Sequence, residues 1–89
     1  MLDHLAEIME ELRPQLDPEL TEVGLEVLAS QVYLQRQAAL RVREEGLMVL
    51  DGRGNPVPHP AIAIERDLRK EILGWLEKYR REPGVRVPD

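Results

Sequence analysis

The side chains that most often catalyse reactions are few and far apart in this sequence. Ser30 is the single serine, and it falls in the middle of a long predicted helix. The two histidines, His4 and His59, lie 55 positions apart, and spacing suggests no acid–base partner for either. Nucleophilic catalysis needs a nucleophile, a base and an orienting group that converge. We therefore expect no catalytic residue and a protein that is not an enzyme.

Metal and phosphate sites are not indicated either. The sequence has no cysteine and no pair of histidines at a helical ligand spacing. The segment Asp51–Asn55 has the glycines of a tight loop but lacks the later acidic ligands of a calcium loop. No Gly-Lys-Ser/Thr follows Gly52-Arg53-Gly54, as it would in a phosphate-binding loop. We expect no metal ion and no cofactor, and we interpret this segment as a turn.

Basic residues are the remaining candidates for chemistry, and they form two groups. Arg36 and Arg43 are seven positions apart, so they share a helix face. With Arg53 they form either a basic strip for DNA or ion-pair donors to the acidic start of another subunit. The second group lies at the end of a helix, where cations suit the helix dipole and can also contact phosphates. It consists of Lys78, Arg80, Arg81 and Arg86.

Composition indicates a small domain that is not expected to be stable as an isolated monomer. The chain has 89 residues, of which 43% are hydrophobic but three are aromatic, so a thin aliphatic core is expected. The net charge is −5, and residues 1–22 hold seven acidic residues against one basic residue. This balance argues against nonspecific coating of nucleic acid. The acidic start and the lack of an apolar run near 20 residues predict no signal peptide, no membrane and an intracellular protein.

We expect the chain to be a single domain over 1–89. Helical spacing, together with proline and glycine at helix ends, divides it into segments. Pro14 ends a first short acidic helix. Asp17-Pro18 is a start signal for a second helix, and Gly46 is the stop signal at its end. Pro60 suits the first position of a third helix. The predicted fold class is all-α, with a core of two long helices in a hairpin. The segments are a helix at 2–13, a helix at 18–45, a β-hairpin-like arm at 47–58, a helix at 60–81 and a tail at 82–89.

The helix at 18–45 has apolar residues on two sides, more than one neighbouring helix covers. One seam holds Leu25, Leu28, Val32 and Ala39, and the other holds Val23, Val27, Leu34, Ala38 and Val42. We attribute the surplus to a partner subunit. The arm carries Asp-Gly, a hairpin signal, and its exposed apolar residues favour pairing with neighbouring subunits. The candidate interface residues are Leu25, Leu28, Val32, Leu47, Val49 and Val57.

The helix at 60–81 has one clear apolar face. It consists of Ala61, Ile64, Leu68, Ile72, Trp75, Leu76 and Tyr79. Trp75 and Tyr79 are expected to anchor the core at the end of this helix. His59, just before Pro60, is expected to cap the helix or fill a pocket. Gly74 lies on the outer face, where it permits a close approach by another chain.

The order of several short motifs resembles that of the phage terminase small subunits. The motifs are Tyr33-Leu34-Gln35-Arg36-Gln37-Ala38-Ala39-Leu40, Glu45-Gly46-Leu47, Asp51-Gly52-Arg53-Gly54-Asn55, His59-Pro60-Ala61 and Glu65-Arg66. In that family, a helix with a tyrosine leads to Glu-Gly, a short arm with a glycine turn, an Asn-Pro or His-Pro step and a final helix. The resemblance covers roughly residues 16–80.

The resemblance implies a DNA-packaging component of a tailed bacteriophage in the host cytoplasm. Such subunits assemble into ring-shaped homo-oligomers, bind double-stranded viral DNA and regulate the ATPase and nuclease of the large terminase subunit. A second hypothesis follows from the residues alone: a helical adaptor that binds no DNA and docks its acidic first helix on a basic protein partner.

Overall fold

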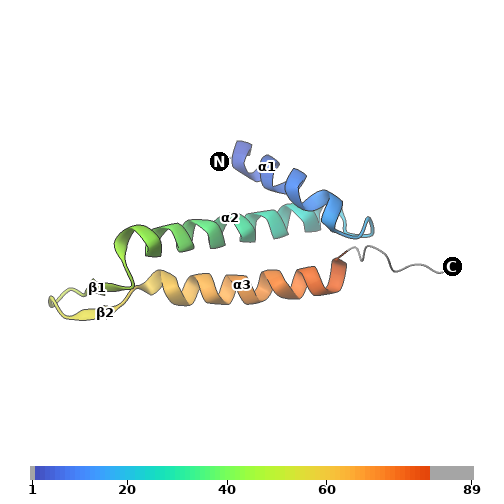
Figure 1. Cartoon of the computed structure of the whole chain (residues 1–89). Coiled ribbons are helices and arrows are strands. Elements are labelled where there is room, and N and C mark those ends of the chain that lie inside the picture. The colour runs from blue at the N-terminus through green and yellow to red at the C-terminus, as the bar shows by residue number, and fades with distance from the viewer. Residues whose placement is uncertain (1, 81–89) are drawn as a thin grey trace.

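The computed structural model describes residues 2–80, which form three helices and a two-stranded antiparallel ribbon (Figure 1). Helix α2 lies beside α3 to make a hairpin, and α1 packs on the outer side of α2. The ribbon extends beyond the far ends of α2 and α3 as an arm, so the molecule measures 62 × 27 × 18 Å. The elements are α1 (Leu2–Leu12), a 3-10 turn (Arg13–Gln15), α2 (Glu22–Glu45), β1 (Met48–Leu50), β2 (Pro56–Pro58) and α3 (Pro60–Tyr79).

The predicted helical hairpin with a short first helix and a β arm is therefore confirmed. Its core lies where α1 and α3 both meet α2. Leu28 and Ala29 of α2 are completely buried there. Trp75 and Tyr79 are partly buried against the core, as predicted, and their ring centroids lie 5.7 Å apart. The buried residues of this cluster are Ile8, Leu12, Leu16, Leu25, Leu28, Ala29, Val32 and Ile72.

Two details of the predicted helices are wrong. Helix α2 begins at Glu22 rather than at residue 18, and Thr21 caps it by accepting a hydrogen bond from the Gly24 N–H at 3.0 Å. Asp17 is not the cap because its N–H donates to the Tyr79 carbonyl while its side chain accepts from the Glu19 N–H, which closes a turn. On α3, Ile64 is 54% exposed and does not join the core. The tail at 82–89, with Arg81 before it, lies outside the described residues.

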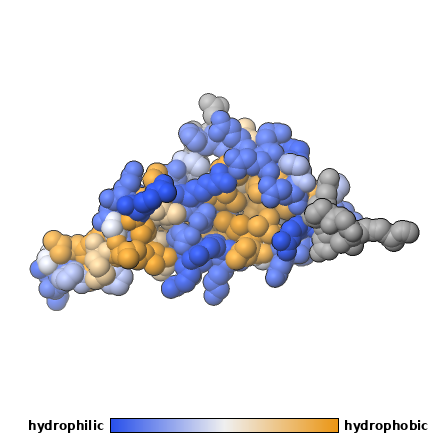
Figure 2. Space-filling model, in the orientation of Figure 1, coloured by the Kyte–Doolittle hydropathy of each residue, from blue (hydrophilic) through white to orange (hydrophobic). Residues whose placement is uncertain are grey.

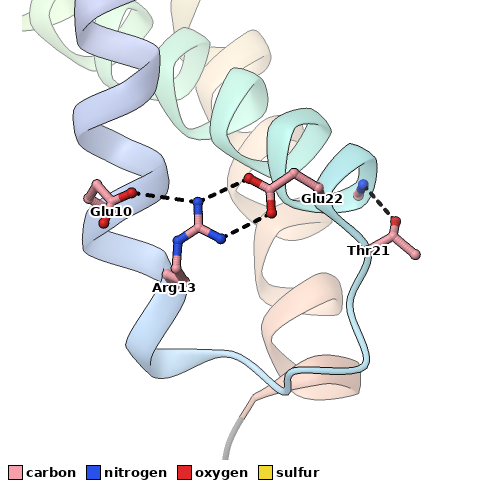
Figure 3. Close-up of polar contacts among 5 residues, drawn as sticks. Glu10, Arg13, Thr21 and Glu22 are labelled. Atoms are coloured by element: carbon pink, nitrogen blue, oxygen red, sulfur yellow. Dashed lines mark hydrogen bonds and ion pairs between the residues drawn. The ribbon is translucent and has the colours of Figure 1, made fainter.

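A single arginine ties α1 to the start of α2. The Arg13 guanidinium donates to both carboxylate oxygens of Glu22, each at 3.0 Å, and lies 3.5 Å from Glu10 (Figure 3). These hydrogen bonds lower the pKa of the Glu22 carboxyl and raise that of Arg13. The planar guanidinium matches a carboxylate in two-point geometry, so this exposed contact links the end of α1 to the first turn of α2.

Two glutamines cross the gap between α2 and α3. Gln31 donates to Glu71 at 2.6 Å, and Gln35 donates to Glu65 at 2.7 Å. Glu65 also pairs with Arg69 one turn further along α3, at 3.1 Å. Because a shift of one helix along the other would separate these partners, the polar pairs fix the register of the hairpin.

Gly74 supplies a test of how α3 is packed. A Cβ atom built on Gly74 would meet no atom within 4 Å among the described residues. Alanine also restricts the unfolded chain more than glycine does. We expect Gly74→Ala to raise the free energy of unfolding by about 0.5–1 kcal/mol in a urea titration.

The matched control is Gly54→Ala. Gly54 has a φ of +82°, which an L-residue adopts at a cost, so this variant should lose stability despite the open space around it. A loss of stability in Gly74→Ala would instead mean that another surface packs closely on α3.

Candidate interaction surfaces

His59 holds the base of the arm to both long helices. Its imidazole is buried, and its Nδ1 accepts from the Ala61 N–H at 3.0 Å, which caps α3 as predicted. The Nε2 lies 2.7 Å from Glu45 at the end of α2. A neutral ring with its hydrogen on Nε2 satisfies both contacts. The His59 hydrogen bond is the main cause that lowers the pKa of the Glu45 carboxyl, followed by a hydrogen bond from Arg41.

The arm itself is closed by Asp51. Its side chain accepts from the Arg53 N–H at 2.8 Å and from the Asn55 N–H at 2.9 Å, while its own N–H donates to the Asn55 carbonyl. These backbone hydrogen bonds, with that of Asn55 first, lower the pKa of the Asp51 carboxyl. Within residues 2–80, the nearby Arg53 guanidinium has no ion-pair partner.

The seven candidate DNA-binding residues do not come together. Arg36 pairs with Glu11 of α1 at 3.0 Å, so it meets the acidic first helix of its own chain. Arg43 and Arg53 lie at the arm end of the molecule, whereas Lys78 and Arg80 lie at the other end of α3 (Figure 1). A helix of this length separates the two ends by about 30 Å. Arg81 and Arg86 fall outside the described residues.

The apolar surface left open on α2 is not the one assigned from the sequence. Leu25, Leu28 and Val32 are buried in the chain's own core, so that part of the predicted interface is corrected. α1 and α3 both converge on this seam. On the opposite seam Ala38 is buried and Val42 is partly buried, but three other residues stay exposed among the described residues. The uncovered residues, which we call the α2 seam, are Val23, Val27 and Leu34, with exposed fractions of 70%, 45% and 52%.

Helical periodicity identified the α2 seam but did not assign it to the interface. A signal that would have found it is the polar pair Gln31 and Gln35. These residues meet Glu71 and Glu65 and so mark the direction from α2 toward α3. Leu5, Ile8 and Leu12 of α1 then need the remaining buried face of α2. The seam that neither neighbour reaches follows from these two directions.

The interface residues predicted on the arm are exposed or partly exposed in the structure. Leu47 is 67% exposed, and Val49 and Val57 are partly exposed. In the face drawn in Figure 2, apolar side chains gather on the arm and over the middle of the helical hairpin. Concave surface in the described chain is shallow, such as a groove of about 340 Å³ that Arg41, His59 and Ile64 help to line.

Within residues 2–80, no group of three or more His, Cys, Asp or Glu side chains is placed to hold a metal ion. In the same part of the chain, every helix is too short or too polar to cross a membrane.

Comparison with protein-family models, with curated proteins and with solved structures finds no match for this chain.

The contact between Glu45 and His59 predicts a pH dependence. The folded pKa of Glu45 lies below its ordinary value of 4.5, so the carboxylate stabilises the folded state above that pH and loses this effect as the pH falls through the folded pKa. We expect Glu45→Gln to be less stable than the wild type at pH 7. The difference in unfolding free energy should shrink below about pH 4.5, as measured by denaturant titration at several pH values.

Glu44→Gln is the control, because the neighbouring Glu44 is exposed and makes no ion pair in the described chain. A loss of the same size and the same pH dependence in both variants would show that the effect comes from general charge and not from the His59 contact.

Proposed function

We propose that this chain is the small terminase subunit of a bacteriophage DNA-packaging motor. It is a homo-oligomeric protein without catalytic activity that binds viral DNA and regulates the large ATPase and nuclease subunit. The observation that carries the proposal is the uncovered α2 seam on a narrow helical hairpin whose motif order resembles that family. A hairpin of this kind gains a larger core when copies pack side by side.

The size of the α2 seam supports assembly. Val23 and Leu34 are eleven positions apart, so the seam runs about 16 Å along α2. Ile64 of α3, 54% exposed, lines a shallow groove with Gln37 and Arg41 of α2. This places a further apolar side chain beside the helix that carries the seam. Exposed apolar side chains gathered on neighbouring helices are typical of a protein–protein contact.

DNA binding in this proposal depends on repetition of a local basic group. Lys78 and Arg80 make no ion pair within the described residues, and Lys78 lies over the ring of Tyr79 at 5.4 Å. One subunit offers few phosphate contacts and carries a net charge of −5. In an assembly, the same contacts occur once in every subunit, and weak contacts on one DNA molecule add up.

The assembly part of the proposal predicts the effect of charge in the α2 seam. Val27→Glu with Leu34→Glu places two charges where a second copy would bury apolar surface. Light scattering should give a multi-subunit mass for the wild type and a much lower mass for this variant. Circular dichroism should be unchanged, because both side chains are exposed in the protomer.

Ala63→Glu is the control for that experiment, since it adds charge at an exposed position of α3 on the side opposite the buried Ala61 and Ile72. It should leave the mass unchanged. A wild-type monomer, or a seam variant that keeps its full mass, would contradict the proposed assembly.

The DNA part predicts the effect of removing the basic group. Lys78→Ala with Arg80→Ala should weaken binding to double-stranded DNA. The slope of log affinity against log salt should fall by about 0.9 for each phosphate that the variant no longer neutralises. Fluorescence anisotropy at several salt concentrations measures both quantities.

Arg66→Ala with Lys70→Ala removes the same charge from the middle of α3 and serves as the control. Equal losses in both variants would mean that net charge and not this group governs binding. A wild-type protein that retains no DNA even at low salt would favour the adaptor hypothesis.

A further inference from the structure

The two edges of the arm differ in their ability to form hydrogen bonds. Within the ribbon, the His59 N–H donates to the Leu47 carbonyl and the Asp51 N–H to the Asn55 carbonyl. Because backbone groups alternate in direction along a strand, those of residues 47, 49 and 51 point toward β2. The backbone groups of Met48 and Leu50 therefore point outward. The register pairs Met48 with Pro58, Val49 with Val57 and Leu50 with Pro56.

The same alternation leaves the outer edge of β2 without donors. Its outward positions are Pro56 and Pro58, and proline has no backbone N–H. The outer edge of β1 keeps both the N–H and the carbonyl of Met48 and of Leu50. A further strand can therefore add to the arm at β1, whereas the prolines prevent a regular ladder at β2.

The side chains of the arm favour such an addition. All six paired residues of the ribbon are apolar, and Met48 and Leu50 are 54% and 71% exposed. A two-stranded ribbon is marginally stable in water by itself, and an open apolar edge is a template for pairing. The arm extends away from the helical core, so the described chain provides no strand to cover this edge (Figure 1).

We propose that β1 pairs antiparallel with β1 of a second copy, around a two-fold axis at Val49. This deepens the self-association proposed above and rests on it. Met48 of one copy lies opposite Leu50 of the other, and each such pair exchanges both of its N–H···O bonds. The product is a four-stranded sheet in the order β2, β1, β1, β2.

A second copy fits this edge because the segment is complementary to itself. The register at Val49 uses the outward groups of both Met48 and Leu50 in each copy. A register centred on Met48 would instead need Gly46, whose N–H already donates to the Val42 carbonyl. The proline edges stop further growth, so the contact closes on two copies and does not continue into a fibre.

Charge adds to this fit. Continuing the register beyond the strands brings Arg53 of one copy toward the last turn of α2 in the other. The exposed Glu44 lies in that turn and has no ion-pair partner among the described residues, and neither does Arg53. In this arrangement the two opposite charges would lie near the point where the chains leave the shared sheet. An assembly held by this contact contains an even number of subunits.

A cysteine-free chain makes the contact testable by disulfide formation. Val49→Cys places one thiol from each copy at the two-fold axis, where facing Cα atoms of a pair without hydrogen bonds lie about 4.5 Å apart, within disulfide range. Under mild oxidation of the full chain, this variant should form a covalent dimer. Val57→Cys is the control. Its two copies lie three strand spacings apart, about 14 Å, so it should remain uncrosslinked.

A second pair of substitutions separates backbone pairing from apolar contact. In the Val49→Cys background, Leu50→Pro removes an outward N–H and leaves the inner ladder intact, so crosslinking should drop at least tenfold. Leu50→Ala keeps that N–H and should crosslink far more than the proline variant. Equal crosslinking of Val49→Cys and Val57→Cys, or none in either, overturns the proposal. Equal rates for proline and alanine overturn it as well.

The mass of the wild-type chain distinguishes this failure from failure of the proposed function. A multi-subunit species by light scattering, together with no Val49→Cys dimer, removes the arm contact but leaves the assembly through the α2 seam. A monomer with no covalent dimer removes both.

Discussion

The side chain of Leu28 is fully enclosed because α1 and α3 reach α2 from two directions. This double cover is the constraint on which the other features depend. It decides which residues of α2 are used inside the chain, and it leaves the opposite seam of Val23, Val27 and Leu34 open. The arm, which connects α2 to α3, lies at the far end of the narrow hairpin, where no helix of residues 2–80 covers it. The open surfaces of the molecule thus follow from how its small core is built.

Local signals in the sequence were enough to place most elements. Pro60 after His59 marks the start of α3, and Gly46 marks the end of α2, because each residue has a backbone property that suits one helix end. The start of α2 could not be predicted in the same way. Asp17-Pro18 has the chemistry of a cap, but the Asp17 N–H is used by Tyr79, a residue 62 positions away. Contacts over such distances are not visible in a local pattern.

The interface residues show a similar limit. Periodicity identified two apolar seams on α2, and both have apolar residues at helical spacing. Which seam becomes core depends on the direction from which α1 and α3 approach, and that is a tertiary property. The partners of the basic side chains could not be predicted either, for a similar physical reason. Arg36 and Arg43 share a face, yet one meets Glu11 and the other lies beyond the reach of α1. A residue type defines the charge of a side chain but not its neighbour.

The link between the α1–α2 turn and the end of α3 also bears on how the chain is made. Leu16 forms an isolated β-bridge with Arg80, next to the hydrogen bond between Asp17 and Tyr79. During synthesis on the ribosome, the first helix and the turn are complete long before their partners at positions 79 and 80 exist. The contacts that join the α1–α2 turn to the end of α3 therefore form only after the last turn of α3 has been made. A chain that stops before Tyr79 lacks both of these contacts, so the turn between α1 and α2 is then held only by its links to α1 and α2.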